Sequence, residues 1–250
     1  PYFITLEEAA QQIVEKEECT MVVKDPASDA DTQAEQIREM INEGINAIFL
    51  CPVDWEKITP SLEALKEADV KIVNVDTQVK EMDYVDAYIG SDNYNAGVLC
   101  GEDLIKRCPD GGKVAILECP TQNSVNERIT GFEETLAKAE NGFEIVARED
   151  TSGEFQKSLE AAQKILSENS DIVAIMCGND QMAIGALKVL KEYGKRMPED
   201  VKLMGYDDVF LASVVEPSLS TIHIRKKHAG IEAAKILFQR IEEQDEKFHD

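Results

Sequence analysis

The sequence predicts an α/β fold built from parallel β-sheets, and the alternation of two patterns carries this prediction. Short apolar segments of strand length alternate with longer segments whose apolar residues recur at helical spacing. Most of the short segments are apolar throughout, as strands buried on both faces of a parallel sheet are. Strand, helix and strand repeated at this spacing are typical of right-handed βαβ units in a doubly wound sheet. With 250 residues, the chain has room for one large α/β unit or two lobes of ordinary size.

The expected elements follow this alternation from one end of the chain to the other. The expected strands are the short apolar runs 20–23, 47–50, 70–75, 114–117, 143–146, 172–176 and 201–204. The expected helices are 4–16, the segment "DTQAEQIREMINEG" that Gly44 ends, 57–68, 93–107, 124–140, 155–168 and 180–193. A last helix, rich in Glu and Lys, closes the sequence.

Charge and composition exclude several classes of partner. Lys and Arg number 26 and Asp and Glu 49, which gives a formal net charge of −23. A surface this acidic is a poor partner for nucleic acid or anionic lipid, and the one compact basic cluster, residues 225–228, reads as a solvated helix start. No apolar stretch is long enough to span a bilayer. We therefore expect no nucleic-acid binding through this chain and no membrane insertion.

The sequence lacks the motifs that mark common cofactor and catalytic sites. It contains neither GxGxxG nor GxxxxGK[ST], and no GxSxG, HExxH or EF-hand pattern. The six cysteines form no CxxC pair, and there are only three histidines. We therefore expect no cofactor, no metal and no catalytic residue, so that the chain binds a molecule without transforming it.

Hydrogen-bonding side chains follow the carboxyl ends of several expected strands. Asp76 and Thr77 follow "KIVNV", Arg128 follows "VAILECP", Asn179 follows "AIMCG" and Asp207 follows "KLMGY". In a doubly wound sheet such residues converge on one crevice. Carboxylate, amide and guanidinium groups each make paired hydrogen bonds, which suits a molecule with adjacent hydroxyls.

Aromatic residues accompany this polar set. Tyr2, Phe3 and Phe155 lie near the starts of helical segments and are suited to stack on the apolar face of a sugar ring. Each residue also has a purely structural interpretation. Asp76 and Asp207 can cap helices, Arg128 can be a surface residue and Phe155 can belong to the core. Caps alone do not explain Arg128 together with Asn179 and Asp207, so we favour a binding site.

The segments that carry these residues resemble a known family. They are "PYFITLEEAA", "NVDTQ", "YIGSDNYNAG", "NERITGF", "CGNDQMAIGAL", "GYDD" and "PSLSTI", in order along nearly the whole chain. The set resembles the ribose-binding-like (type I) periplasmic sugar-binding proteins, which share their core with lac-repressor-like regulators. The resemblance implies two doubly wound lobes joined by a hinge, with the ligand trapped between them by closure.

The resemblance also implies boundaries and roles. The amino-terminal lobe would be residues 1–90 plus 225–250, with its first and last strands apparently missing, and the carboxyl-terminal lobe 91–224. Stacking on the sugar would fall to Tyr2, Phe3 and Phe155, and hydroxyl binding to Asp76, Arg128, Asn179 and Asp207. Two positions depart from the family pattern. Thr77 stands where ribose binders usually carry Arg, and Ile224 stands where members often carry Gln, so ribose itself becomes doubtful.

Two functions are consistent with this resemblance. The first is a solute-binding protein that captures a small sugar or related polyhydroxylated ligand for the membrane permease of an ABC transporter, outside the cytoplasm. The alternative is the effector-binding core of a lac-repressor-like transcription regulator, which would be cytoplasmic and would need a DNA-binding segment. A sensor ectodomain would look the same at this level.

Overall fold

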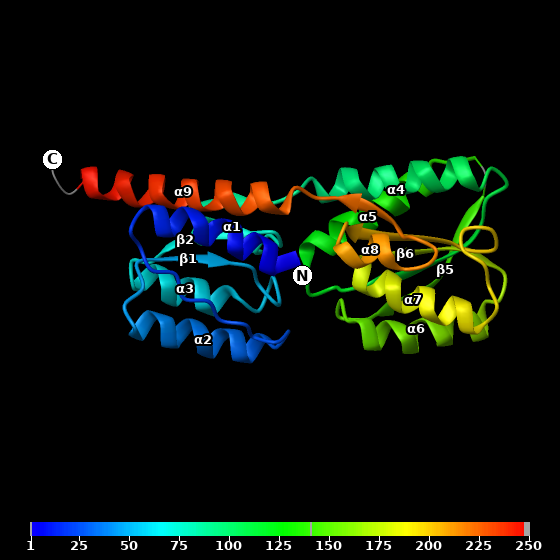
Figure 1. Ribbon diagram of the computed structural model, residues 1–250, viewed down its shortest axis with the longest axis horizontal. Coiled ribbons are helices and arrows are strands. Elements are labelled where there is room, and N and C mark those ends of the chain that lie inside the picture. The colour runs from blue at the N-terminus through cyan, green and yellow to red at the C-terminus, as the bar shows by residue number, and fades with distance from the viewer. Residues whose placement is uncertain (1, 141, 248–250) are drawn as a thin grey trace. The chain divides into compact units, whose positions relative to one another are not determined.

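The computed structural model describes residues 2–140 and 142–247, which form two α/β units (Figure 1). Within the described residues, unit 1 contains 2–91, 121–123 and 225–247, and unit 2 contains 92–120 and 124–224. Residues 248–250, which the expected amino-terminal lobe includes, lie outside the described residues. All strand pairs in both units are parallel. The predicted α/β class with parallel sheets is confirmed.

Unit 1 is a three-stranded sheet with helices on both faces. The strands, in the order β1-β2-β3, are β1 (Ala47–Leu50), β2 (Lys71–Val75) and β3 (Ala87–Ile89). One face carries α1 (Tyr2–Lys16) and α9 (Lys226–Lys247), and the other carries α2 (Ala30–Asn42) and α3 (Thr59–Glu67), as Figure 1 shows. A single 3₁₀ turn, η1 (Met82–Tyr84), precedes β3.

Successive residues of β2 supply two separate cores in unit 1. Ile72 packs in the cluster that holds Leu62 and Leu65 of α3, while Val73 packs with Leu6 of α1 and Leu237 of α9. Side chains of a strand alternate between its faces, so an all-apolar strand requires cover on both sides. This alternation explains why two apolar residues, Ile72 and Val73, stand next to each other in the sequence.

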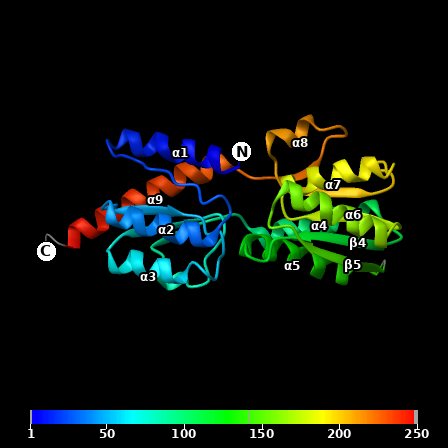
Figure 2. The ribbon, with the colours of Figure 1, turned by 90° about the horizontal axis from the view of Figure 1, so that it is seen from below.

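Unit 2 is a five-stranded sheet of the same architecture. The strand order is β5-β4-β6-β7-β8, with bounds β4 (Gly112–Glu118), β5 (Phe143–Asp150), β6 (Ile172–Cys177), β7 (Lys202–Asp207) and β8 (Ser220–His223). The helices are α4 (Asn93–Arg107), α5 (Asn123–Ala137), α6 (Phe155–Glu168), α7 (Asp180–Glu192) and the short α8 (Phe210–Val214). Figures 1 and 2 show α4 and α5 on one face of the sheet and α6 and α7 on the other.

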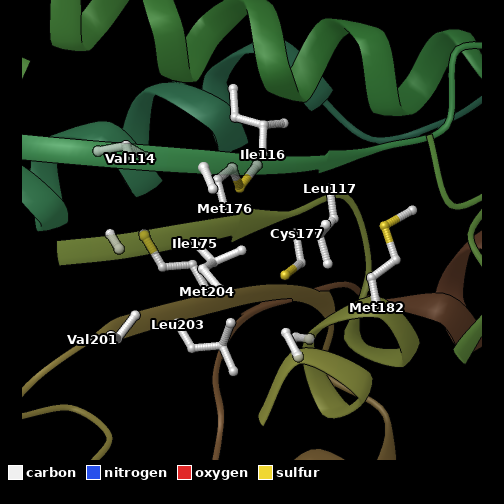
Figure 3. Packing of buried hydrophobic residues seen from close by; sticks show 14 of the residues in the cluster. Val114, Ile116, Leu117, Ile175, Met176, Cys177, Met182, Val201, Leu203 and Met204 are labelled. Atoms are coloured by element: carbon white, nitrogen blue, oxygen red, sulfur yellow. The ribbon is translucent and has the colours of Figure 1, made fainter. Parts of the chain in front are cut away.

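The core of unit 2 is one continuous cluster centred on β4 and β6. Figure 3 shows Ile116, Ile175 and Met176 on these neighbouring strands, and all three are essentially inaccessible to solvent. Cys177 at the end of β6 packs beside Leu117 in the same view. A free cysteine in such a position acts as a small hydrophobic residue. The core therefore fixes the ends of β4 and β6, where the polar residues begin.

Several predicted elements agree closely with the structure, and one is wrong. The helices expected at 93–107 and 155–168 and the strand at 47–50 coincide with α4, α6 and β1. The strand expected at 20–23 is wrong, because this segment is irregular and pairs with no strand in the described chain. Its Val22 and Val23 are about half exposed. Apolar, β-branched residues favour a strand only where a neighbouring strand and a packed face receive them.

The sequence missed the short elements. The strands β3 and β8 have three and four residues, and α8 has five. Both strands lie at sheet edges, and elements this short show no periodic pattern in the sequence. Among the described residues, no helix combines the length and apolar character needed to cross a membrane.

Candidate ligand-binding site

The carboxyl ends of the strands in unit 2 bring four predicted residues to one edge of the sheet. The strands β4, β6 and β7 are neighbours and run parallel, so their ends meet at the same edge. Asp207 ends β7, and Asn179 lies two residues beyond β6. Arg128 lies on α5, which follows β4, and Phe155 begins α6, which follows β5. These four residues therefore lie at the same edge of the sheet of unit 2.

Arg128 is the most constrained side chain at this edge. It is only 4% exposed. Its Nε donates to Oδ1 of Asn93 at 2.9 Å, and its Nη1 donates to the backbone carbonyl of Gly178 at 2.7 Å. The guanidinium carbon lies 3.4 Å from the ring centroid of Tyr206, a cation–π contact. The structural alternative for Arg128, a solvated surface residue, is therefore excluded.

The third nitrogen of the Arg128 guanidinium is Nη2. Among the described residues, no acceptor receives a hydrogen bond from Nη2 of Arg128. A guanidinium stays charged at any physiological pH and has five N–H donors in a fixed plane. The partners that hold Nε and Nη1 therefore also fix the direction in which Nη2 can donate.

The neighbouring strand end is shaped by Asn179 and Asp180. Oδ1 of Asn179 accepts from the backbone N–H of Met182 at 2.9 Å, so Asn179 is the N-cap of α7. Its Nδ2 donates to the carbonyl of Gly153 at 3.2 Å, which joins the turn before α6 to this edge. Asp180 is fully buried, and its Oδ2 accepts from the backbone N–H of Val209 at 2.9 Å. The second polar residue of this junction thus fixes the loop that follows β7.

That loop holds its acidic residues in unusual backbone conformations. Asp207 has φ 110° and Asp208 has φ 51°, both in the region that favours glycine. Oδ2 of Asp208 lies 2.6 Å from Nδ1 of His223, and its backbone N–H donates to Oγ1 of Thr221 at 3.1 Å. Strained residues of this kind persist where the surroundings hold them, and they are common at ligand sites. The neighbouring strand β8 supplies those restraints here.

The predicted residues of unit 1 also gather at a strand end. Asp76 follows β2 with φ 67°, and its Oδ1 accepts from the hydroxyl of Tyr2 at 2.7 Å. Its Oδ2 receives a longer hydrogen bond from Cys51 Sγ at 3.9 Å. The hydroxyl of Tyr88 donates to the Asp76 carbonyl at 2.8 Å. Tyr2 and Asp76, 74 residues apart in the sequence, are therefore in direct contact.

A buried amide builds the turn that presents Asp76. Asn74 is inaccessible to solvent, and its Nδ2 donates to the carbonyls of Leu50 at 3.0 Å and Thr77 at 2.8 Å. Its Oδ1 accepts from the backbone N–H of Val79 at 3.0 Å. Buried polar groups require such partners, and this amide satisfies three backbone groups around the turn. Thr77, at 1% exposure, lies inside this turn.

The aromatic residues expected to stack on a ligand are open to solvent. Phe3 is 50% exposed and Phe155 is 39% exposed. The rings of Tyr2 and Phe3 meet edge to face, with centroids 5.0 Å apart. Neither exposed ring is a core residue. Such partly open rings at helix starts are available for stacking.

Sequence reasoning missed the residues that hold the predicted ones in place. Asn93 and Tyr206 contact Arg128, and the hydroxyl of Tyr206 also donates to Oδ1 of Asn93 at 3.1 Å. Cys51 contacts Asp76. The available signals were a polar Asn74 within an apolar strand and Asn93 at a helix start. Neither signal shows which side chain the residue holds, because the partners are distant in sequence.

The described residues contain no group of three or more His, Cys, Asp or Glu side chains that could hold a metal ion. The polar set consists of carboxylates, amides, hydroxyls and one guanidinium. Its chemistry is that of hydrogen bonding to a neutral polar molecule.

Comparison with known proteins connects this arrangement to a family. The family model described as "Periplasmic binding protein domain" matches residues 1–245. The ribose import binding protein of Bacillus subtilis is 26% identical over 223 residues, covering 88% of this chain and 70% of its own length. The D-ribose/D-allose-binding protein of Pseudomonas aeruginosa is 29% identical over 219 residues, covering 83% and 67%.

A regulator and solved structures also match. The HTH-type transcriptional repressor PurR of Escherichia coli O1:K1 is 28% identical over 249 residues, covering 96% of this chain and 70% of its own length. A solute-binding protein of an ABC transporter from Actinobacillus succinogenes, solved with bound D-allose, is 25% identical with a TM-score of 0.84, covering 97% of this chain and 87% of that one. One from Mycobacterium smegmatis, solved with bound glycerol, is 26% identical with a TM-score of 0.86, covering 96% and 83%. The match of the family model to residues 1–245, supported by this likeness of fold, shows that the chain belongs to the periplasmic binding protein domain family.

Proposed function

We propose that this protein binds a small sugar or related polyhydroxylated compound and delivers it to the membrane permease of an ABC transporter. The observation that carries the proposal is the guanidinium of Arg128, whose Nε and Nη1 are fixed while Nη2 has no acceptor among the described residues. A nearly buried cation held in this way is preorganised to donate to a ligand oxygen. Binding then requires no cofactor and no chemical step.

Carboxylates complement this donor. Asp76 in unit 1 and Asp207 in unit 2 supply acceptors for ligand hydroxyl groups, and Asn179 supplies an amide. Phe3 and Phe155 supply apolar ring faces, which match the C–H faces of a sugar. Within unit 2, the carboxylate of Asp207 offsets the charge of the Arg128 guanidinium, which favours a neutral ligand over an anionic one.

The relatives support the ligand class and the transport role. Two curated relatives are named as ribose or ribose and allose binders, and the similar structure from Actinobacillus succinogenes holds D-allose. A transporter component of this class works outside the cytoplasm, so we propose an extracytoplasmic location. The permease partner and the absence of catalysis belong to the same proposal.

A thermal-shift panel tests the proposed function directly. The panel contains pentoses, hexoses, polyols, nucleosides and furanosyl compounds. A ligand that binds only the folded state, present at a hundred times its Kd, adds about 2.7 kcal/mol to the free energy of unfolding. We expect one class of sugar or polyol to raise the unfolding midpoint of the wild type and not that of Arg128→Ala. Arg107→Ala is the matched control, since Arg107 is an exposed helical arginine that pairs with Asp103.

One observation favours the regulator alternative. The repressor aligns over 249 residues and covers 96% of this chain, more than the two sugar-binding relatives do. A regulator core that serves a two-fold DNA site is expected to be a dimer, because operator symmetry mirrors protein symmetry. Sedimentation analysis separates the two functions. A stable dimer together with no response to any sugar or polyol would contradict the transport proposal.

A further inference from the structure

The carboxylate of Asp76 is held at both of its oxygens by different side chains. Tyr2 donates to Oδ1 at 2.7 Å, and the sulfur of Cys51 lies 3.9 Å from Oδ2, a distance that suits a weak S–H···O hydrogen bond. Tyr2 lies at the start of α1 and Cys51 directly follows β1. Two elements that are separate in the sequence therefore converge on one carboxylate.

Thr77 also acts on the sulfur of Cys51. Hydrogen bonding from the backbone N–H and the hydroxyl of Thr77 favours the thiolate and lowers the pKa of Cys51, against the larger upward effects of burial and of Asp76. Thr77 is 1% exposed, and its carbonyl accepts from Asn74, so the residue is fixed on several sides. The side chain at position 77 is therefore turned toward Cys51 within the fold of unit 1.

The protonation state of Cys51 suits the role of donor. Burial raises the pKa of the Cys51 thiol far above its usual value, and the negative charge of Asp76 raises it further. The thiol consequently keeps its proton at neutral pH. A protonated sulfur can donate to the Asp76 carboxylate while it accepts from Thr77.

We propose that Thr77, Cys51 and Tyr2 form a hydrogen-bonded chain that fixes the Asp76 carboxylate, and that Thr77 and Cys51 are positioning residues for the ligand. This inference rests on the proposed function, because it treats Asp76 as a residue that contacts the ligand. A carboxylate has roughly four lone-pair sites, and the chain occupies two of them. The remaining sites then have a fixed direction toward a ligand hydroxyl. Thr77 thus acts on the ligand through Cys51 and Asp76.

The first experiment needs no ligand and measures the S–H stretching band of Cys51 in the infrared spectrum. Subtracting the spectrum of Cys51→Ser isolates this band from those of the other five cysteines. We expect Asp76→Ala to shift the band to higher wavenumber, because the acceptor of the S–H bond is lost. If Asp76→Ala fails to fold, Asp76→Asn replaces it, because it keeps the side-chain volume. We expect Asp76→Asn to shift the band less than Asp76→Ala. Asp83→Ala, an exposed carboxylate on η1, is the control.

The second experiment measures affinity with D-allose and D-ribose as probes. Removing one neutral hydrogen bond costs on the order of 1 kcal/mol, so Thr77→Val should weaken binding about threefold to tenfold. Thr77→Ser keeps the hydroxyl and should stay within about twofold of the wild type. Rescue by the conservative variant distinguishes a hydrogen-bonding role from a packing role.

The outcomes separate this inference from the proposed function. A Cys51 band that is the same in the wild type, Asp76→Ala and Asp76→Asn overturns the hydrogen-bonded chain, whether or not any sugar binds. Equal affinities of Thr77→Val and Thr77→Ser overturn the positioning role. Failure of the wild type to respond to the whole ligand panel contradicts the proposed function, and the infrared result still decides whether the chain exists.

Discussion

The two units hold their principal charged residues in different ways. In unit 2, Arg128 is nearly buried and is fixed by an amide, a backbone carbonyl and an aromatic ring. In unit 1, Asp76 is held chiefly by the side chains of Tyr2 and Cys51, and it remains partly exposed. A nearly buried donor thus belongs to the larger sheet, and a partly exposed acceptor, held by two side-chain hydrogen bonds, belongs to the smaller one. Residues at equivalent strand ends are therefore held by different means in the two units.

The largest expected effect is loss of ligand binding when unit 2 loses a charged residue. Arg128→Ala and Asp207→Ala should each weaken sugar binding at least about a hundredfold, since removing a charged residue that bound ligand would bury costs about 3 kcal/mol or more. Both variants are expected to keep the fold, which circular dichroism checks. Isothermal titration calorimetry measures the affinity. Unchanged affinity in both variants would refute the assignment of this edge as the site.

The next effect concerns the close helix contacts that place Arg128. A Cβ at Gly97 on α4 would lie 1.9 Å from the backbone oxygen of Arg128, so α4 and α5 must separate in Gly97→Ala. Overpacking of this kind costs about 1–3 kcal/mol of unfolding free energy. Gly230→Ala is the counterpart in unit 1, because its Cβ would lie 2.3 Å from the carbonyl of Leu6 on α1.

Urea unfolding measures this effect, and Asn95→Ala, an exposed position on α4, is the control. We expect Gly97→Ala to weaken sugar binding as well, because it displaces the backbone of Arg128. If Gly97→Ala has the same free energy of unfolding as Asn95→Ala, then α4 and α5 tolerate a wider spacing.

Alkaline pH should lower the free energy of unfolding of unit 2 through its buried thiols. Burial raises the pKa of Cys100 to about 12, and burial followed by the charge of Asp180 raises the pKa of Cys177 well above its usual value. The folded state therefore keeps protons that the unfolded state releases. Below about pH 9 each protonated thiol makes its full contribution to the free energy of unfolding. Above that pH the contribution falls by about 1.4 kcal/mol per pH unit.

Urea unfolding between about pH 8 and about pH 11 measures this loss. Cys100→Ala should show a shallower decline with pH than the wild type, and Cys19→Ser, at an exposed site, should not. Parallel declines in all three proteins would contradict the assignment to Cys100.

The smallest expected effect is removal of one hydroxyl in unit 1. Tyr2→Phe keeps the ring and loses the bond to Asp76, which should weaken sugar binding about threefold to tenfold. Tyr94→Phe is the matched control, since that hydroxyl also donates to a carboxylate, Glu134, at an exposed position. A loss as large as that of Arg128→Ala would show that Asp76 is as rigidly held as Arg128.

Much of the fold was predictable because the central strands of the larger sheet are buried on both faces. The apolar runs of β4 and β6 and the helical periodicity of α4 and α6 follow from cover on both faces of a parallel sheet. The strands β3 and β8 were missed because three and four residues are too few to show a recognisable apolar character. The segment 20–23 has that character but has no partner strand in the described chain. Local pattern therefore predicts burial better than it predicts pairing.

The α/β class, most element positions and the candidate residues at strand ends follow from the sequence alone, because these depend on neighbours in the chain. How those residues are held depends on the tertiary structure. Asn93 meets Arg128 and Tyr206, and Tyr2 meets Asp76, across separations of 35 to 113 residues. Helix and strand periodicity reflects interactions within a few positions, whereas side-chain partners depend on which strand ends become neighbours in the sheet. Which strand ends become neighbours is therefore set only when the chain folds.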